Sequence, residues 1–127
     1  MAIRGEIHQV SEFQLAVLMP EMAAEIRDAA RLSRHILVGR IGQELLCVIG
    51  FIPVTFLSDE AYIWMHTTEA ASNHKLIVGR HARQVIPRAL EAYTKLIGHC
   101  LTGASRRWLE TLGAEFITDN VFEIRRA

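Results

Sequence analysis

The alternation of apolar and polar residues changes its period near the start of the chain. Residues 3–9 alternate between the two kinds, which predicts a short strand with one solvated face. Ser11 has Gln14 three residues ahead of it, a spacing that predicts a capping box at the start of a helix. Val10 and Leu15 flank this start and are placed to form a hydrophobic staple. The sequence therefore predicts a strand that leads directly into a helix.

Pro20 interrupts the apolar stripe of this helix, so we expect two consecutive helices. β-Branched and large apolar residues then predict strands over residues 36–40, 44–52 and 61–67. A tight turn at residues 41–43 should join the first two of these strands. Because residues 45–51 are almost all apolar, the second strand should be central and covered on both faces. The third strand is also expected to be buried, and the polar residues 68–73 to form a loop.

A longer helical stripe opens the C-terminal half of the chain. Apolar residues recur at helical spacing from His74 to Tyr93, and Pro87 within this stripe should kink or split the helix. The remaining predicted elements are a strand over 95–102, a helix over 105–112 that Gly113 ends, and strands over 115–118 and 121–125. The resulting order, β-α-α-β-β-β-α-β-α-β-β, predicts an α+β fold.

Composition narrows the classes of protein that fit. The 127 residues, 50% of them hydrophobic, suffice for one domain over residues 1–127. The chain has 14 Lys and Arg and 14 Asp and Glu, and zero net charge argues against nucleic acid as the main partner. We find no signal-peptide core and no apolar run of membrane-spanning length, so a soluble, non-secreted protein is expected. Cys47 and Cys100 lie in apolar runs and are expected to be buried in a reducing compartment.

The most specific segment is residues 104–116, which read ASRRWLETLGAEF. It combines a short helix, a Leu-Gly stop and the start of a strand, and glycine is needed because the chain leaves the helix in a left-handed conformation. Together with the order of elements along the whole chain, this segment resembles the acetyl-CoA-dependent N-acetyltransferases of the GNAT superfamily. The resemblance implies a mixed, mostly antiparallel sheet of about seven strands flanked by about four helices.

Three segments carry a narrower resemblance. They are AYIWMHTT at residues 61–68, YTKL at 93–96 and WLETLGAEF at 108–116. These segments look like the acetyltransferase-like internal virion proteins of short-tailed bacteriophages. The resemblance implies a location in the virion or in the cytoplasm of the bacterial host, with other virion proteins or further copies of this chain as partners.

GNAT enzymes bind the pyrophosphate of their cofactor on backbone N–H groups where the fourth strand leads into the third helix, usually through Gln/Arg-x-x-Gly-x-Gly/Ala. The corresponding segment, residues 73–82, reads NHKLIVGRHA and fits this pattern in neither register. Lys75, Arg80 and Arg83 can still neutralise phosphate as point charges. If acetyl-CoA binds, the resemblance assigns its contacts to Thr67, Lys75, Gly79 and Arg80.

Many members of the superfamily also carry a tyrosine four residues before the helix-ending glycine, where it protonates the departing thiolate. That position is Leu109 here, and Trp108 beside it has no acidic proton to donate. His66 ends the strand that normally lines the acceptor site and is a candidate general base, with Glu69 as a second candidate catalytic residue. The alternative for His66 is a hydrogen-bonded histidine at a strand end.

The other polar and aromatic residues support no separate site. His74 and His81 share a helix face but lack metal-ligand spacing, so no metal is expected. His99 and Cys100 are adjacent on a strand and point to opposite faces, so they cannot form a nucleophile and base pair. Trp64 either lines a ligand groove or packs on the long helix, and packing is favoured.

Three hypotheses for function remain. The intact architecture, the altered pyrophosphate segment and the missing tyrosine favour a GNAT-fold virion protein that acts through protein contacts and requires no cofactor. The alternative is an active N-acetyltransferase that uses acetyl-CoA to modify a small amine or a host protein. A phage-encoded regulator that blocks a host protein is the third.

Overall fold

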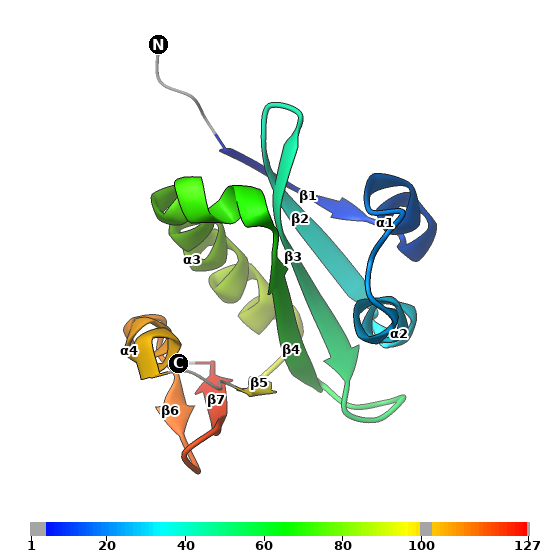
Figure 1. Ribbon diagram of the computed structural model, residues 1–127. Coiled ribbons are helices and arrows are strands. Elements are labelled where there is room, and N and C mark those ends of the chain that lie inside the picture. Colours follow the sequence, from blue (N-terminus) through cyan, green and yellow to red (C-terminus); the bar gives the residue numbers. More distant parts are fainter. Residues whose placement is uncertain (1–4, 100–102, 127) are drawn as a thin grey trace.

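The computed structural model describes residues 5–99 and 103–126 (Figure 1). In this part of the chain, seven strands form one sheet in the order β1-β2-β3-β4-β5-β7-β6. The strands are β1 Gly5–Val10, β2 His35–Ile41, β3 Glu44–Pro53, β4 Glu60–Thr67, β5 Lys95–His99, β6 Glu115–Phe116 and β7 Val121–Arg125. The helices are α1 Glu12–Leu18, α2 Ala24–Leu32, the 3-10 helix η1 Glu69–Asn73, α3 Lys75–Ala92 and α4 Gly103–Thr111. The predicted α+β class with a mostly antiparallel sheet is confirmed.

The sheet separates two layers of helices. α1 and α2 lie on one face and α3 and α4 on the other (Figure 1). The core on the α1/α2 face is formed by Val10, Leu15, Met22, Ala30, Ile36, Val38 and Val48. The core on the α3/α4 face includes Ile49, Phe51, Val85, Tyr93, Leu96, Phe122 and Ile124. Because successive strand residues point to opposite faces, β3 contributes side chains to both cores.

The start of α1 forms as predicted. The Ser11 N–H donates to Gln14 Oε1 at 2.8 Å, and the Gln14 N–H donates to Ser11 Oγ at 3.0 Å, which completes the capping box. Val10 and Leu15 are buried in the same cluster, as the predicted staple requires. The two predicted helices are α1 and α2, and Pro20 lies between them.

β3 is the central strand that the sequence predicts. It pairs antiparallel with β2 on one side and with β4 on the other. Its residues from Leu46 to Phe51 are all buried, so the prediction of a strand covered on both faces is confirmed. The β2–β3 turn contains Gly42 at a φ of +58°, a left-handed conformation that glycine adopts at little cost.

β4 is more exposed than predicted. Ala61 is its one buried residue, while Tyr62 and Met65 are 42% and 41% exposed. β5 pairs with β4 only over residues 60–62, so Met65 lies where β4 has a neighbouring strand on the β3 side alone. Tyr62 is exposed although it pairs with Ile97 of β5.

Two predictions about the segment from residue 68 to residue 93 need correction. Residues 68–73 were expected to form a loop, but Glu69–Asn73 is the 3-10 helix η1. α3 is one continuous helix through Pro87, so Pro87 does not split it. The predicted strand over 95–102 is observed as Lys95–His99, and residues 100–102, which include Cys100, lie outside the described residues.

The end of α4 confirms the predicted Leu-Gly stop. Gly113 has a φ of +97°, so the chain leaves the helix in a left-handed conformation. The Ala114 N–H donates to the Leu109 carbonyl at 3.1 Å, and the Gly113 N–H donates to the Glu110 carbonyl at 3.1 Å. These two bonds form a Schellman motif, which satisfies carbonyl groups at the end of α4 before β6 begins.

β4 and β5 form a fork. At its paired end, residues 60–62 of β4 lie parallel to residues 95–97 of β5. β5 continues through Gly98 and His99, which pair with β7 and not with β4. The open end of the fork is therefore the edge of β4 over residues 63–67. This fork is the one parallel pairing in the described sheet.

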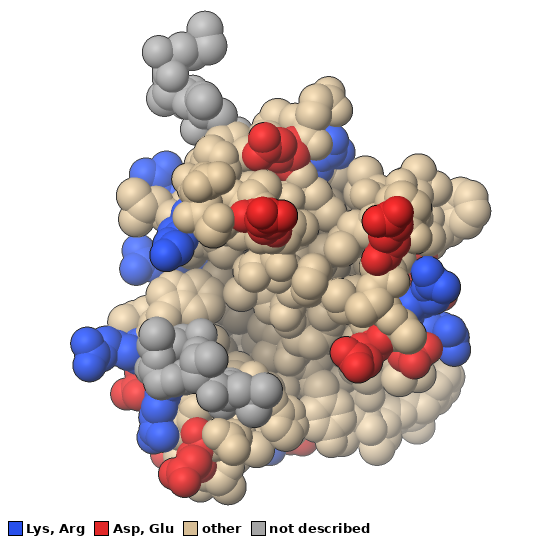
Figure 2. All heavy atoms as spheres, viewed as in Figure 1, with Lys and Arg blue, Asp and Glu red and all other residues tan. Residues whose placement is uncertain are grey.

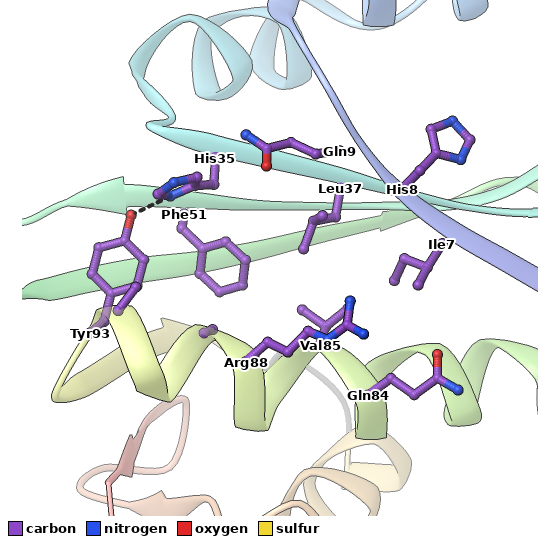
Figure 3. A pocket seen from close by; sticks show the side chains of 12 residues that line it. Ile7, His8, Gln9, His35, Leu37, Phe51, Gln84, Val85, Arg88 and Tyr93 are labelled. Atoms are coloured by element: carbon purple, nitrogen blue, oxygen red, sulfur yellow. Dashed lines mark hydrogen bonds between the residues drawn. The ribbon is translucent and has the colours of Figure 1, made fainter.

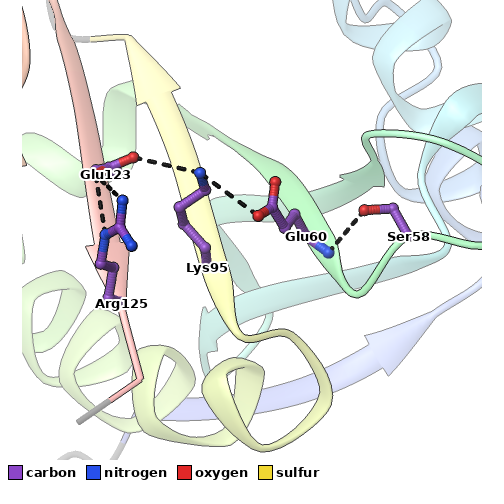
Figure 4. Close-up of polar contacts among 5 residues, drawn as sticks. All are labelled: Ser58, Glu60, Lys95, Glu123 and Arg125. Carbon is purple, nitrogen blue, oxygen red and sulfur yellow. Dashed lines mark hydrogen bonds and ion pairs between the residues drawn. The ribbon is translucent and has the colours of Figure 1, made fainter.

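Charged side chains connect the strands at the paired end of the fork (Figure 4). Lys95 Nζ lies 3.5 Å from Glu60 Oε2 on β4 and 3.6 Å from Glu123 Oε2 on β7. Arg125 Nη2 donates to Glu123 Oε1 at 2.8 Å. Hydrogen bonds from Arg125, with the nearby charges of Arg125 and Lys95, lower the pKa of the Glu123 carboxyl. The paired end thus combines strand pairing with ion pairs across three strands.

Candidate active site

The open end of the fork adjoins a recess in the surface. Figure 2 shows this recess at the centre of the view, lined by uncharged residues, with basic side chains to its left over α3 and α4 and acidic side chains above it and to its right. Along β4, residues 63–67 pair with β3 on one side, and no strand in the described residues pairs with their other side. Backbone N–H and C=O groups at such an edge can pair with an extended amide-containing ligand.

His66 lies on the face of β4 opposite to that of Thr67. It pairs with Val48, a member of the α1/α2 core, and is half-buried. An open cavity of about 490 Å³ surrounds it, and the other lining residues are Met19, Pro20, Glu21, Met22, Ala23 and Ile26. All of these belong to the α1–α2 connection and the start of α2. The cavity is mostly apolar, and among the described residues that line it Glu21 and His66 are the titratable ones.

Thr67, Thr68 and Glu69 carry the chain from β4 into η1. Thr67 pairs with Cys47, and its side chain is exposed. Thr68 ties this passage to β3, because its Oγ1 donates to the Leu45 carbonyl at 2.6 Å and its N–H donates to the Leu46 carbonyl at 2.9 Å. Glu69 is exposed at the first position of η1. His66 and Glu69 therefore belong to different elements, and the described contacts do not join them.

The predicted cofactor residues of α3 lie along its first two turns. Lys75 is the first residue of the helix and is exposed, as is Arg80. The His74 carbonyl accepts from the Ile77 and Val78 N–H groups, each at 3.1 Å. The N–H groups of Lys75 and Leu76 precede these donors, in the part of a helix where amides have no intrahelical partner. Anions bind in such a position.

Gly79 lies within α3 rather than at its start. A Cβ built on Gly79 would lie 3.8 Å from the Trp108 Nε1 of α4, so its hydrogen faces the indole of α4. This distance is an ordinary van der Waals contact, so a larger residue such as alanine would fit at position 79. The geometry shows Gly79 at the approach of α3 to α4, one turn beyond the amides that could meet a phosphate.

Leu109 occupies the position where many GNAT enzymes carry a tyrosine. Its side chain is half-buried and packs against the α3/α4 core. Leucine has no proton to donate, so α4 supplies no general acid at this position. The neighbouring Trp108 contacts α3 instead, near Gly79.

Trp64 packs in the interior, but on the other face from the one predicted. Its Nε1 donates to Ser33 Oγ at 2.7 Å, and its half-buried ring packs against the α1/α2 core. A Cβ on Gly50, its partner on β3, would lie 2.1 Å from Trp64 Nε1, so Gly50 makes room for the indole. The prediction of packing is therefore confirmed, while packing on the long helix is wrong. Alternation within a strand fixes which residues share a face, but not which helix covers that face.

Cys47 is a structural residue of the core rather than a reactive one. Cys47 is fully buried on β3, as expected of a small core residue. Burial raises the pKa of its thiol, partly offset by a hydrogen bond from the Gly39 backbone, which favours the inert thiol form. Within residues 5–99 and 103–126, no group of three His, Cys, Asp or Glu side chains could hold a metal ion.

Sequence reasoning identified His66 but missed the side of its cavity formed by residues 19–26. The available signal was Pro20 between two methionines, Met19 and Met22, in a break between helices. Flexible methionines commonly line adaptable binding surfaces. The ion pairs of Lys95 were also missed, because they join residues that are distant in the sequence.

Solved structures share this architecture. A protein from Acinetobacter baylyi assigned as an acetyltransferase matches with a TM-score of 0.77 at 12% identity, over 99% of this chain and 95% of that one. One from Staphylococcus epidermidis with the same assignment matches with a TM-score of 0.72 at 13% identity, over 97% of this chain and 99% of that one. The chain has the GNAT acetyltransferase fold.

A third GNAT-fold structure contains coenzyme A. This Bacillus subtilis acetyltransferase, solved in complex with CoA, matches with a TM-score of 0.68 at 10% identity, over 99% of this chain and 100% of that one. No protein-family profile and no curated protein matches the sequence. Among the helices of the described residues, none has the length and apolar character needed to cross a membrane. The comparisons thus establish the GNAT fold for this chain.

Proposed function

We propose that this protein is an acetyl-CoA-dependent N-acetyltransferase that acts on a primary amine with an apolar body. One observation carries the proposal. At the same stretch of β4, one face presents His66 to a cavity, and the edge beside it has no strand partner among the described residues. An acyl donor along that edge and an amine in the cavity would meet at the same strand.

The residues around the open end of the fork fit the cofactor. The edge of β4 over residues 63–67 offers backbone groups to the amides of a pantetheine arm. The first amides of α3 and the exposed Lys75 and Arg80 suit its phosphates. The glycine pattern is absent, so side-chain charge would carry more of the pyrophosphate binding than in other GNAT enzymes.

Acetyl-CoA, when bound, supplies a thioester whose carbonyl carbon accepts the amine. An amine is protonated near neutral pH and must lose a proton before it can attack. His66 is a suitable acceptor for that proton, because a neutral imidazole has one ring nitrogen that accepts a hydrogen bond. Glu21, the one carboxylate lining the cavity, would attract the ammonium form, and Met19, Met22 and Ile26 would contact an apolar body.

Leu109 predicts slow turnover rather than none. Loss of one general acid typically costs about 10²–10⁴-fold in rate. A departing thiolate is a weak base whose conjugate acid has a pKa of about 8.5, so water can protonate it. We therefore expect a modest kcat.

A direct test measures acetyl-CoA binding and turnover. Calorimetry should detect acetyl-CoA binding with micromolar affinity, and release of free thiol should accompany acetylation of an arylalkylamine such as phenethylamine. His66→Gln should lower kcat by about 10²–10⁴-fold while leaving acetyl-CoA affinity unchanged. His8→Gln is a matched control on β1, away from the His66 cavity, and should keep both kcat and the affinity for acetyl-CoA unchanged. Absence of acetyl-CoA binding, or equal rates for His66→Gln and the unaltered protein, would overturn the proposal.

A second candidate function is a virion component that acts by binding other virion proteins or further copies of itself. The exposed face of α1 favours this candidate, since Phe13 and Val17 are four residues apart and 77% and 66% exposed. Leu109 is compatible with it, because assembly needs no general acid. Expression during phage growth, followed by proteomics of purified particles, should recover the chain at fixed stoichiometry. Particles that lack it would remove this candidate.

A further inference from the structure

A second cavity lies on the opposite face of the sheet from His66. It is about 290 Å³ in volume and lies between the C-terminal half of α3 and strands β1, β2 and β3 (Figure 3). Its apolar walls include Ile7, Leu37, Phe51 and Val85. On α3 it is lined by the small residues Ala89 and Ala92, which leave the space that larger side chains would fill. It takes no part in the acetyl-transfer chemistry proposed above.

One end of this cavity is cationic. Gln84 and Arg88 stand one turn apart on α3, so they share a helix face, and both rise toward the sheet beneath Ile7 and Leu37 (Figure 3). Both side chains are exposed and can adjust to a ligand. None of the described residues that line the cavity is Asp or Glu, and Arg88 is the one among them that is always charged. A carboxylate would meet a guanidinium here with no competing anion among those residues.

The other end is aromatic and polar. Phe51 and Tyr93 stack with ring centroids 5.8 Å apart at an interplanar angle of 21°. The Tyr93 hydroxyl is hydrogen-bonded to His35 Nδ1 at 2.9 Å. Burial raises the pKa of the Tyr93 phenol, partly offset by Arg34, so the phenol itself stays un-ionised at neutral pH. His8 also lines the cavity, with its ring on the other side of β1 from Ile7 (Figure 3).

We infer that this cavity binds a small aromatic carboxylate, with the ring against Phe51 and Leu37 and the carboxylate on Arg88. Ligand cavities commonly measure about 300–1,000 Å³, and a volume near the lower limit selects a molecule with a single ring. Arginine binds carboxylates through two parallel N–H donors, which gives direction as well as charge. The apolar middle of the cavity excludes ligands that are charged throughout.

The test uses three probes with the same ring and different head groups: phenylacetate, 2-phenylethanol and phenethylamine. Each is titrated into the ¹⁵N-labelled protein while amide shifts are followed. Phenylacetate should shift amides of Leu37, Val85 and Tyr93 with at most millimolar Kd, and at these amides it should bind at least about tenfold more tightly than either other probe. Equal or tighter binding of phenethylamine at these amides, or phenylacetate shifts confined to other regions, would overturn the inference.

Two variants and one control locate the head group and the ring. Arg88→Gln should weaken phenylacetate binding by about tenfold or more, because it removes the guanidinium. Arg83→Gln removes the same charge from an exposed position of the same helix outside the cavity and should leave the affinity unchanged. Ala92→Leu should narrow the cavity and also weaken binding, with an unchanged melting temperature showing that the fold is kept. Equal affinities for Arg88→Gln and Arg83→Gln would overturn the inference.

Discussion

The two ends of the β4–β5 fork are built from one strand pair but differ in strand pairing and in charge. The paired end has strand hydrogen bonds, the ion pairs of Lys95 and the buried residues Ala61 and Leu96. At the open end, β4 keeps one neighbouring strand in the described sheet, while exposure does not separate the ends, since Tyr62 and Met65 are 42% and 41% exposed. The difference teaches that the contacts which stabilise β4 lie at one end of the strand, and the candidate catalytic residue His66 lies at the other.

The change between the two ends begins at Gly98. A Cβ on this residue of β5 would lie 2.4 Å from Phe122 Cζ and 3.1 Å from Ile63 Cγ2. The Phe122 ring and Ile63 therefore occupy the place of a side chain on Gly98. They close the core at the point where the strands separate, and the open end begins beyond them.

The largest effect is expected from Gly98→Ala. The new methyl group must displace the Phe122 ring, which is 4% exposed and lies against Phe116, so the ring cannot simply turn outward. Overpacking of this kind typically costs about 1–3 kcal/mol, and we expect about 2–3 kcal/mol in urea unfolding. Gly79→Ala is the control, since its methyl group meets only an ordinary contact at 3.8 Å. Helix propensity predicts that this control gains up to about 1 kcal/mol.

A smaller loss is expected from Lys95→Met, which keeps most of the apolar stem and removes the charge. Glu60 and Glu123 would then face each other without the ammonium between them. Because Lys95 is partly exposed, we expect a loss of about 1 kcal/mol at low salt, and less at high salt. The control is Arg31→Met, whose pair with Asp28 is exposed on α2 and should cost less than about 0.5 kcal/mol. Equal losses of unfolding free energy in the two variants would show that the ion pairs of Lys95 do not stabilise the paired end.

Low pH should reduce the stabilisation that Glu123 provides at the paired end of the fork. Its pKa is lowered in the folded protein from the ordinary value of 4.5, chiefly by hydrogen bonds from Arg125, so ionised Glu123 contributes stability above about that pH. The contribution is lost as the pH falls through the lowered pKa. The difference in unfolding free energy between the unaltered protein and Glu123→Gln should therefore be constant near neutrality and shrink below pH 4.5. A difference that grows in acid would contradict this account.

The smallest effect on stability is expected at the open end, from Met65→Gln. Met65 is exposed, so the change should cost less than about 0.5 kcal/mol in urea unfolding. Ile49, its partner on β3, is 2% exposed, and Ile49→Gln should cost several times as much. If acetyl-CoA binds along β4, Met65→Gln should nevertheless raise the KM for acetyl-CoA. A large stability loss would show that the open end is covered after all.

Local signals made much of this fold predictable. The capping box of Ser11 and the stop at Gly113 depend on residues within a few positions of one another, and both form as expected. The apolar run of β3 predicted a central strand because burial on both faces leaves no polar positions. These features need no knowledge of the rest of the chain.

The features that sequence reasoning did not find depend on distant residues. The exposure of Met65 follows from where β5 turns away, and the face on which Trp64 packs follows from which helices cover it. The cavity around His66 forms only when the α1–α2 connection folds over β4. His66 could thus be proposed as a site residue from its place at a strand end. Glu21 could not, because it is brought to the same cavity only by the fold.

The positions of the two tryptophans give each layer of helices its own fluorescent reporter. Trp64 emits from the α1/α2 side, where its indole N–H is bound to Ser33, and Trp108 emits from the α3/α4 side, beside Gly79. With one indole replaced by phenylalanine, the remaining spectrum senses solvent and quenchers on a single face of the sheet. Ligands that enter from opposite faces can then be distinguished by which emission they change, without any added label.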